Sequence, residues 1–278
     1  MVGVSSRFSR ALVMVALAFF VVWTLLPIVW AIITSLLPNS AVTQVPPDLS
    51  LSNFSLQNYV QAMSAGPDLP GSMRNSLIVS LITGSLSIIL GAPAAYALSK
   101  LGVRGSQRLL LMILGSQMFP AIIVAIPMFV IFSNLGLTNT YTALIVVNIS
   151  FILPIVIWVL KGFFDSVPDQ IEKSAAIDGA STFRTFMQIV LPISAPPVFA
   201  VAVFAFIESW NEFFFAVILT GFETKTVPIA ISEFSGQYQT LYGQMIASSI
   251  LASIPVVALA IIFRKHIVKG FIEGSVKG

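Results

Sequence analysis

The stretch that decides the fold is SVPDQIEKSAAIDGASTFRTFMQIVLPISAPP, from Ser166 to Pro197. It lies between two strongly apolar runs, yet it is rich in polar residues, alanine and glycine. Its apolar residues are too few to cross a bilayer, which takes about 20 in a row. Its pattern is also too regular for a slack linker. We therefore interpret this stretch, called the polar segment below, as a folded element between two membrane-spanning helices.

The composition is that of a membrane protein. Of the 278 residues, 57% are hydrophobic and only 9% are charged, whereas a soluble domain of this size needs far more charged surface. Several runs of about 20 apolar residues match the hydrocarbon thickness of a bilayer. The alternation typical of an outer-membrane barrel is absent. These features predict an all-α polytopic membrane protein.

The numbers of cysteine and histidine residues and the net charge exclude several classes of function. The chain has no cysteine and one histidine, which excludes disulfides and thiolate chemistry and supplies little for zinc or hydrolase chemistry. The net charge is +3, but excess Lys and Arg in a membrane protein usually reflects its orientation. We expect no metal site, no catalytic residues and no nucleic-acid partner.

Six membrane-spanning helices are expected within a single transmembrane domain, residues 1–278. The first apolar run is too long for a signal-peptide core of about 7–15 residues. Prolines inside several runs predict kinks and favour a bundle packed around a cavity. The expected spans are 11–37, 76–98, 109–132, 141–160, 198–220 and 244–263, with a loop at 163–197 between the fourth and the fifth.

The basic residues predict the orientation. Six spans place both termini on one side, and of the 14 Lys and Arg residues only Arg74 and Lys225 fall on the other side. Because positively charged loops stay in the cytoplasm, both termini and the polar segment are predicted to be cytoplasmic. The basic residues on that side are Arg7, Arg10, Lys100, Arg104, Arg108, Lys161, Lys173, Arg184, Arg264, Lys265, Lys269 and Lys277.

The polar segment itself predicts two short helices. Pro168 suits a helix start, where its missing N–H is not needed, and Glu172 suits the first turn, where the helix dipole favours negative charge. Gly179 permits a tight turn. Ser181 can then cap a second helix, which Pro192 ends.

Two interpretations of these helices remain open on physical grounds. Ile171, Ala175 and Ala176 form a narrow face of small side chains that allows another protein to approach closely. Alternatively, the helices form a lid on the lipid headgroups, with Phe and Ile side chains dipping into the bilayer.

The stretch EKSAAIDGASTFRTFMQIVLP resembles the EAA loop of permease subunits of ABC importers. The glycine, isoleucine and Leu-Pro pair of that motif correspond to Gly179, Ile189, Leu191 and Pro192. The head of the motif differs, because its Glu-Ala-Ala positions read Lys-Ser-Ala here and a glutamate stands one place earlier. Further fragments, RNSLIVS, PAAYALSK, QMFP, LGLTNTY, SWNEFFFA and FIEGSVKG, are similar to the maltose-type sugar permeases.

This resemblance implies the fold and the role of the chain. The fold would be that of a type I ABC importer permease in a bacterial or archaeal cytoplasmic membrane, with cytoplasmic EAA coupling helices and half of a sugar pathway. The partners would be ATP-binding cassette ATPase subunits, a second related permease, an extracytoplasmic sugar-binding protein or lipoprotein, and membrane lipid. The implied ATPase-coupling residues are Glu172, Lys173, Ala175, Ala176, Asp178, Gly179 and Ala180.

The chain lacks a phosphate-binding loop of its own. No Gly-rich run ending in Gly-Lys-Ser/Thr is present, so ATP and Mg²⁺ are expected on the partner ATPase, with no cofactor on this chain. The chain is therefore expected to be a transport subunit without enzymatic activity.

Polar residues inside the expected spans are candidates for the substrate pathway. Ionisable groups at bilayer depth are costly and often functional, and a sugar needs hydrogen-bonding partners. These residues can instead hold helices together. The candidates are Gln117, Asn148, Glu208 and Asn211.

Two other classes remain as alternatives. An ion-coupled secondary transporter can use Glu208, but inverted repeats are not visible and the polar segment has no role in it. A membrane prenyltransferase can use the D-x-x-x-D pair Asp165 and Asp169 to bind Mg²⁺, but it needs a second acidic cluster that the sequence does not supply.

Overall fold

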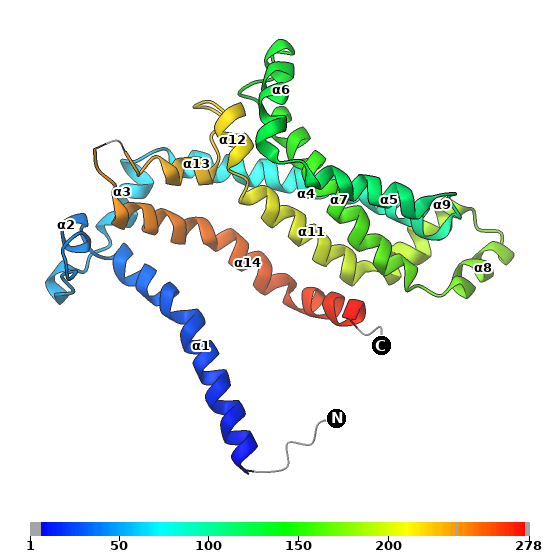
Figure 1. Cartoon of the computed structure of the whole chain (residues 1–278), viewed down its shortest axis with the longest axis horizontal. Helices are drawn as coiled ribbons and strands as arrows, with labels where there is room; N and C mark the ends of the chain where they lie inside the picture. The colour runs from blue at the N-terminus through cyan, green and yellow to red at the C-terminus, as the bar shows by residue number, and fades with distance from the viewer. Residues whose placement is uncertain (1–6, 237, 276–278) are drawn as a thin grey trace. The chain divides into compact units, whose positions relative to one another are not determined.

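The computed structural model describes residues 7–236 and 238–275 (Figure 1), with the side chains of residues 10–236 and 238–265. Of the basic residues assigned above, Lys277 lies outside this range. The described residues are helical apart from turns, connections and one isolated β-bridge.

The chain divides into two compact units, residues 1–69 with 231–251 and residues 70–230 with 252–278. The first unit contains α1 (Arg7–Ser35), α2 (Asn39–Val42), η1 (Leu51–Asn53), α3 (Gln57–Ser64) and the start of α14 (Tyr242–Ser275). The second contains the rest of α14, α4 (Leu69–Lys100) except its first residue, and most of α13 (Val227–Ser232). It also contains the elements between α4 and α13, which are α5 (Ser106–Gly115), η2 (Ser116–Met118), α6 (Ala121–Asn134), α7 (Tyr141–Asp165), α8 (Asp169–Ile177), α9 (Thr182–Thr185), η3 (Phe186–Val190), α10 (Leu191–Ile193), α11 (Ala195–Trp210) and α12 (Phe214–Leu219).

Four of the described helices are long and apolar enough to cross a membrane by themselves: α1, α4, α7 and α14. Two further groups meet the same requirement only when two bent parts are joined. The helices α5 and η2 meet α6 at 88°, and the run from α9 to α10 meets α11 at 82°. The described residues thus supply up to six spans, and the predicted all-α polytopic class is confirmed.

A proline divides the third expected span, 109–132. Pro120 precedes α6, and Phe119 before it is extended, with φ −74° and ψ 123°. A residue in front of proline is disfavoured in the α conformation, because the proline ring contacts its backbone. Figure 1 shows α6 turning away from the line of α5, and the bend places Gln117 at the junction of the two helices.

A second proline shapes the entry to α11. The element η3 is a π-helix that runs directly into α10, whose second residue is Pro192. A proline cannot donate to the carbonyl four residues earlier, and its ring collides with that carbonyl in a regular α-helix. The wider π turn relieves this conflict.

The fifth expected span, 198–220, continues after a short break. α11 ends at Trp210. The Glu212 carboxylate then accepts the backbone N–H groups of Phe215 at 2.7 Å and Ala216 at 3.0 Å. These bonds satisfy the first donors of α12, which would otherwise lack partners at a helix start.

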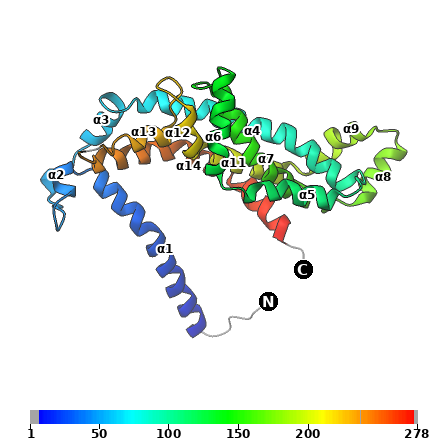
Figure 2. The ribbon, with the colours of Figure 1, turned by 45° about the horizontal axis from the view of Figure 1, so that its top comes forward.

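The main core of the second unit forms where α4, α7 and α11 lie side by side (Figures 1 and 2). Ala95, Leu160 and Ala205 are fully buried there. Gly91 allows α4 to approach α7 closely, because a Cβ atom at this position would lie 2.6 Å from Cγ1 of Val156.

Within the first unit, helix α1 presents an apolar surface that the described residues of that unit leave uncovered. Every side chain from Arg10 to Trp30 is exposed, although the helix is strongly apolar. Such a surface requires lipid or another protein around it.

Candidate functional site

The start of the polar segment has the local structure that the sequence predicts, but the predicted end of its second helix at Pro192 is wrong, because the helical run continues through Pro192 to Ile193. Pro168 precedes α8, whose first turn contains Asp169 and Glu172. Gly179 has φ +78°, a conformation that side-chain-bearing residues rarely adopt. Ser181 then caps α9, its Oγ accepting the backbone N–H of Arg184 at 3.4 Å. Figures 1 and 2 both show α8 and α9 at one end of the second unit.

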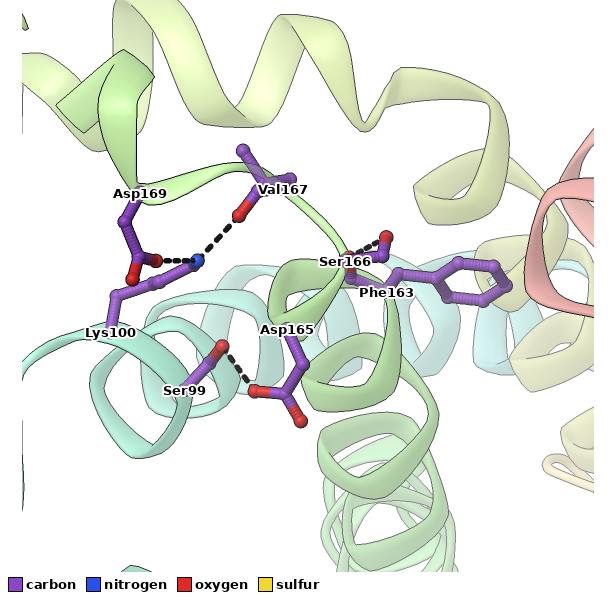
Figure 3. A network of polar contacts seen from close by, with 7 residues as sticks. All are labelled: Ser99, Lys100, Phe163, Asp165, Ser166, Val167 and Asp169. Atoms are coloured by element: carbon purple, nitrogen blue, oxygen red, sulfur yellow. Dashed lines mark hydrogen bonds and ion pairs between the residues drawn. The ribbon is translucent and has the colours of Figure 1, made fainter. Parts of the chain in front are cut away.

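Lys100, the last residue of α4, fastens the start of the polar segment (Figure 3). Its Nζ donates to the carbonyl oxygen of Val167 at 2.6 Å and to Oδ1 of Asp169 at 2.7 Å. The Lys100 side chain is only 6% exposed, whereas that of Asp169 is 70% exposed. The hydrogen bond and the charge of Lys100 lower the pKa of the Asp169 carboxyl, and Lys173 contributes in the same direction.

Asp165 makes a second connection at the same place. Its Oδ1 accepts a hydrogen bond from Ser99 at 2.6 Å (Figure 3), and its Oδ2 pairs with Lys161 at 2.8 Å. The two carboxylates of the D-x-x-x-D pair therefore each face a lysine of the same chain. No cluster of three or more metal-ligating side chains occurs among the described residues, so the arrangement gives no support to a prenyltransferase.

An aromatic cluster lies beneath these polar contacts. The Tyr96 ring packs on Phe186 with centroids 4.9 Å apart and against Phe164 at 6.1 Å. Oε1 of Glu172 is enclosed by protein and has no hydrogen-bond partner among the described residues. The aromatic cluster joins α4, α7 and η3, and the Glu172 side chain reaches into the protein.

The implied coupling residues divide between the interior and the surface. Ala175 is buried, Glu172 and Ala180 are half-buried, and Lys173, Ala176, Asp178 and Gly179 are exposed. The expected face of Ile171, Ala175 and Ala176 is also divided, because Ile171 packs against the core cluster.

Two large apolar side chains stand out on the exposed side of the polar segment. Ile177 is 86% exposed and Phe183 is 73% exposed. They stand on either side of Gly179 in the sequence, and a Cβ atom on Gly179 would meet nothing within 4 Å. The exposed surface thus combines apolar groups with an open backbone.

The four pathway candidates have different surroundings. Asn148 is buried on α7 and its Nδ2 donates to Oγ of Ser209 on α11 at 2.9 Å. Glu208 is exposed, Gln117 is half-buried, and Asn211 is exposed, with its Nδ2 bonded to the carbonyl of Ile207 at 2.9 Å. The structure therefore brings Asn148 next to α11 and leaves Glu208 open on that helix.

The residues that fasten the polar segment escaped the sequence-based prediction. Lys100 entered the sequence analysis only as one of the cytoplasmic basic residues, and Tyr96 only as part of the fragment PAAYALSK. Nothing in local spacing joins Lys100 to Asp169, because 69 residues separate them. The available signal was a basic residue at the end of one span and an acidic one at the start of the polar segment.

Comparison with known proteins identifies the family. Residues 87–273 match the family described as "Binding-protein-dependent transport system inner membrane component", which is more than half of the chain.

Several relatives match over nearly their whole length. The chain is 33% identical to the trehalose/maltose transport system permease protein MalG of Thermococcus litoralis, over 97% of each chain. It is 35% identical to the trehalose transport system permease protein SugB of Mycobacterium tuberculosis, over 92% of this chain and 93% of the relative. It is 32% identical to the sulfoquinovosyl glycerol transport system permease protein SmoH of Agrobacterium fabrum, over 99% and 97%.

The fold also matches a solved transporter. A chain from the crystal structure of a bacterial ABC transporter involved in the import of the acidic polysaccharide alginate superposes with a TM-score of 0.76 at 22% identity, covering 94% of this chain and 98% of that one. This likeness confirms the predicted ABC importer permease fold. The chain belongs to the family of inner-membrane components of binding-protein-dependent transport systems, the permeases of ABC transporters, in which ATP hydrolysis takes place on a separate subunit.

Proposed function

We propose that the chain is the permease subunit of an ATP-driven importer of a sugar or oligosaccharide, and that it forms half of the translocation pathway. The family assignment supports the transport role, and the relatives named for trehalose, maltose and sulfoquinovosyl glycerol support a carbohydrate cargo. The other half would come from a second related permease, and an extracytoplasmic binding protein would deliver the sugar.

The observation that carries the coupling proposal is the exposed apolar surface of the polar segment. Ile177 and Phe183 flank an open Gly179 in a segment that the distribution of basic residues predicts to be cytoplasmic. Large apolar groups exposed to water mark a protein contact or a lipid contact. Together with the EAA-like pattern, they favour docking into a cleft of the partner ATPase over a lid on the headgroups.

The contacts at the start of the polar segment can transmit a movement of α8 to the membrane-spanning helices. Lys100 and the aromatic cluster of Tyr96, Phe164 and Phe186 join the segment to α4, α7 and η3. Movement of α8 by the ATPase would therefore displace these helices together. Reversing a 1:99 equilibrium between two states takes about 5.5 kcal/mol, and this energy would come from ATP on the partner.

The pathway proposal rests on α7 and α11. Glu208 and Asn211 are exposed, and a second permease would cover them to form the pathway, while Gln117 lies at the α5–α6 bend. For Asn148, the bond to Ser209 favours a role in holding α7 against α11. We expect Glu208→Ala to change the sugar carried or its rate of uptake while the complex still assembles; loss of assembly would assign Glu208 to helix contacts instead.

A substitution of Gly179 tests the docking proposal. Gly179→Trp is compared with Gly102→Trp, since both glycines have positive φ and neither Cβ would meet an atom within 4 Å. The two variants therefore carry similar backbone strain, and only Gly179 lies in the polar segment. Sugar uptake and co-purification of the ATPase are measured in membranes, with the amount of inserted chain as a reference.

We expect Gly179→Trp to remain in the membrane, to lose uptake and to recover little ATPase, while Gly102→Trp retains both. Normal uptake in Gly179→Trp would overturn the docking proposal. Loss of uptake with full ATPase recovery would place the defect after docking. A wild-type complex that imports its sugar without ATP would overturn the whole assignment and return attention to Glu208 as an ion-coupling residue.

A further inference from the structure

A cavity of about 400 Å³ lies within the first unit. Its walls come from the connection between α1 and α3, from α3 itself and from the start of α14 with the residue before it. The volume falls in the range of about 300–1,000 Å³ that small-molecule sites occupy. All of its lining residues belong to the first unit, whereas the pathway candidates belong to the second. The cavity is called the amide pocket below.

The amide pocket has an unusual lining. None of the described residues that line it is charged, and six of them are side-chain amides. Each amide offers both donors and an acceptor without a net charge. Such a lining suits a neutral ligand with many hydroxyl groups, and it offers no counter-charge to a phosphate or a metal ion. The six are Asn39, Asn53, Gln57, Asn58, Gln61 and Gln244.

Hydrogen bonds hold the walls in place before any ligand arrives. Nδ2 of Asn58 donates to the carbonyl oxygens of Ser35 and Leu37, both at 2.8 Å. Oδ1 of Asn39 accepts the backbone N–H of Tyr242 at 3.0 Å. A pocket with fixed walls binds a ligand without a further cost of ordering its own side chains.

Other amide groups keep bonding capacity for a ligand. Nε2 of Gln244 donates to Oε1 of Gln61 at 2.8 Å, which leaves the Gln61 NH₂ group and the Gln244 carbonyl oxygen available. The Asn39 NH₂ group takes no part in the bond to Tyr242. Gln57 is exposed and serves the wall through its backbone N–H, which donates to Ser55. The pocket thus presents donors and acceptors together, as sugar hydroxyl groups require.

Two serines and three apolar residues complete the lining; the apolar residues are Leu36, Pro38 and Leu241. Their side chains provide a surface for the C–H groups of a sugar ring, which remain apolar between the hydroxyl groups. The combination of uncharged amides with an apolar surface matches a monosaccharide or a disaccharide better than an ion.

We propose that the amide pocket is a binding site for a neutral sugar, separate from the pathway residues on α7 and α11. The proposal rests on the proposed function for the nature of the ligand and for the side of the membrane, because the same orientation places the α1–α3 connection outside. A sugar held there would be retained on the outer side of the membrane.

The experiment uses the complete transporter complex in lipid nanodiscs, without binding protein or ATP. ATP-driven uptake into liposomes first identifies the sugar that is imported, and glucose, maltose and trehalose serve as probes if none is found. Isothermal titration then measures affinity for wild type, Gln57→Leu, Ser52→Trp and Gln44→Leu. Ser52 is an exposed residue of the lining, and a tryptophan at this position would fill the pocket. Gln44 is an exposed glutamine outside the lining and serves as the matched control.

We expect Gln57→Leu to weaken binding up to about tenfold, the factor of one ordinary hydrogen bond. Ser52→Trp should abolish binding at this site, and Gln44→Leu should bind as wild type does. A sugar phosphate should bind more weakly than the neutral sugar.

Glu208→Ala is titrated in the same way. Two results would overturn the proposal: sugar binding that all three pocket and control variants retain but Glu208→Ala loses, and no binding of any probe by a complex that imports sugar. Failure of import with intact binding in the amide pocket would count against the proposed function and leave the pocket standing.

Discussion

The two ends of the second unit are fastened by different chemistry. At one end, Nδ2 of Asn75 donates to the carbonyl oxygens of Glu223 and Lys225, both at 2.9 Å, and its Oδ1 accepts from the Tyr141 hydroxyl at 2.7 Å. At the other end, Lys100 binds Asp169 and the Val167 carbonyl. We call these the amide end and the ionic end.

The difference lies in how easily each connection can rearrange. The Asn75 side chain is buried and uses both its nitrogen and its oxygen, so any movement there leaves polar groups without partners. The ionic end joins a buried lysine to a carboxylate in contact with water, and water can replace the protein at the exposed partner. The end that carries the proposed ATPase contact is therefore the more adaptable one.

The strongest test removes the amide end. Asn75→Leu leaves two carbonyl groups and the Tyr141 hydroxyl without their partner, and we expect the free energy of unfolding to fall by about 3 kcal/mol. SDS-induced unfolding of the purified chain in mixed micelles measures the change. The control is Asn134→Leu, since Asn134 is exposed at the end of α6. An equal effect of both variants would show that Asn75 is not a structural junction.

A smaller effect is expected at the ionic end. Lys100→Met leaves the Val167 carbonyl without its donor, and we expect a loss of about 2 kcal/mol in the same assay, with reduced uptake. Lys161→Met removes only the ion pair with Asp165, one helical turn away, and should cost less than about 0.5 kcal/mol. If Lys161→Met proved the more damaging variant, Lys100 would not be the fastening residue.

The smallest effect concerns pH. Because Lys100 lowers the pKa of Asp169 in the folded chain, the contribution of this pair is present above the ordinary carboxyl pKa. It is lost as the pH falls through the lowered value. The chain has no cysteine, so a spin label on Gln170→Cys reports on this site alone, and its mobility should rise on acidification.

The control for the pH experiment is Asp169→Asn, which should make the label mobile at every pH. A wild-type label whose mobility does not change down to pH values well below 4 would contradict a functional Lys100–Asp169 pair.

Sequence alone predicted those features that depend on neighbouring residues. The acidic first turn of α8, the positive φ of Gly179 and the cap at Ser181 all follow from local chemistry. Composition was sufficient for the all-α membrane class. Pro120 was noted in the sequence, but the break in the span at 109–132 was not predicted. A proline in a membrane helix is compatible with either a slight kink or a sharp bend.

Contacts between residues that are far apart in the sequence could not be predicted from it. Asn75 and Lys225 are 150 residues apart, and no local pattern joins them. The sequence also could not show which of Glu172 and Lys173 faces the bundle, because that depends on how α8 packs against the other helices. The exposure of Ile177 and Phe183 likewise depends on how α8 and α9 leave the bundle.

The connections at the two ends have a mechanical consequence for α4 and α7. One joins Asn75 to Tyr141 and the other joins Ser99 to Asp165, and both link residues 66 apart in the sequence. Two helical stretches of equal length are thus hydrogen-bonded to each other at both ends, so that one cannot slide far along the other without breaking these bonds, whereas both can tilt together. Because each stretch is about 36 Å long, a tilt of about 10° about one end shifts the other end sideways by roughly 6 Å.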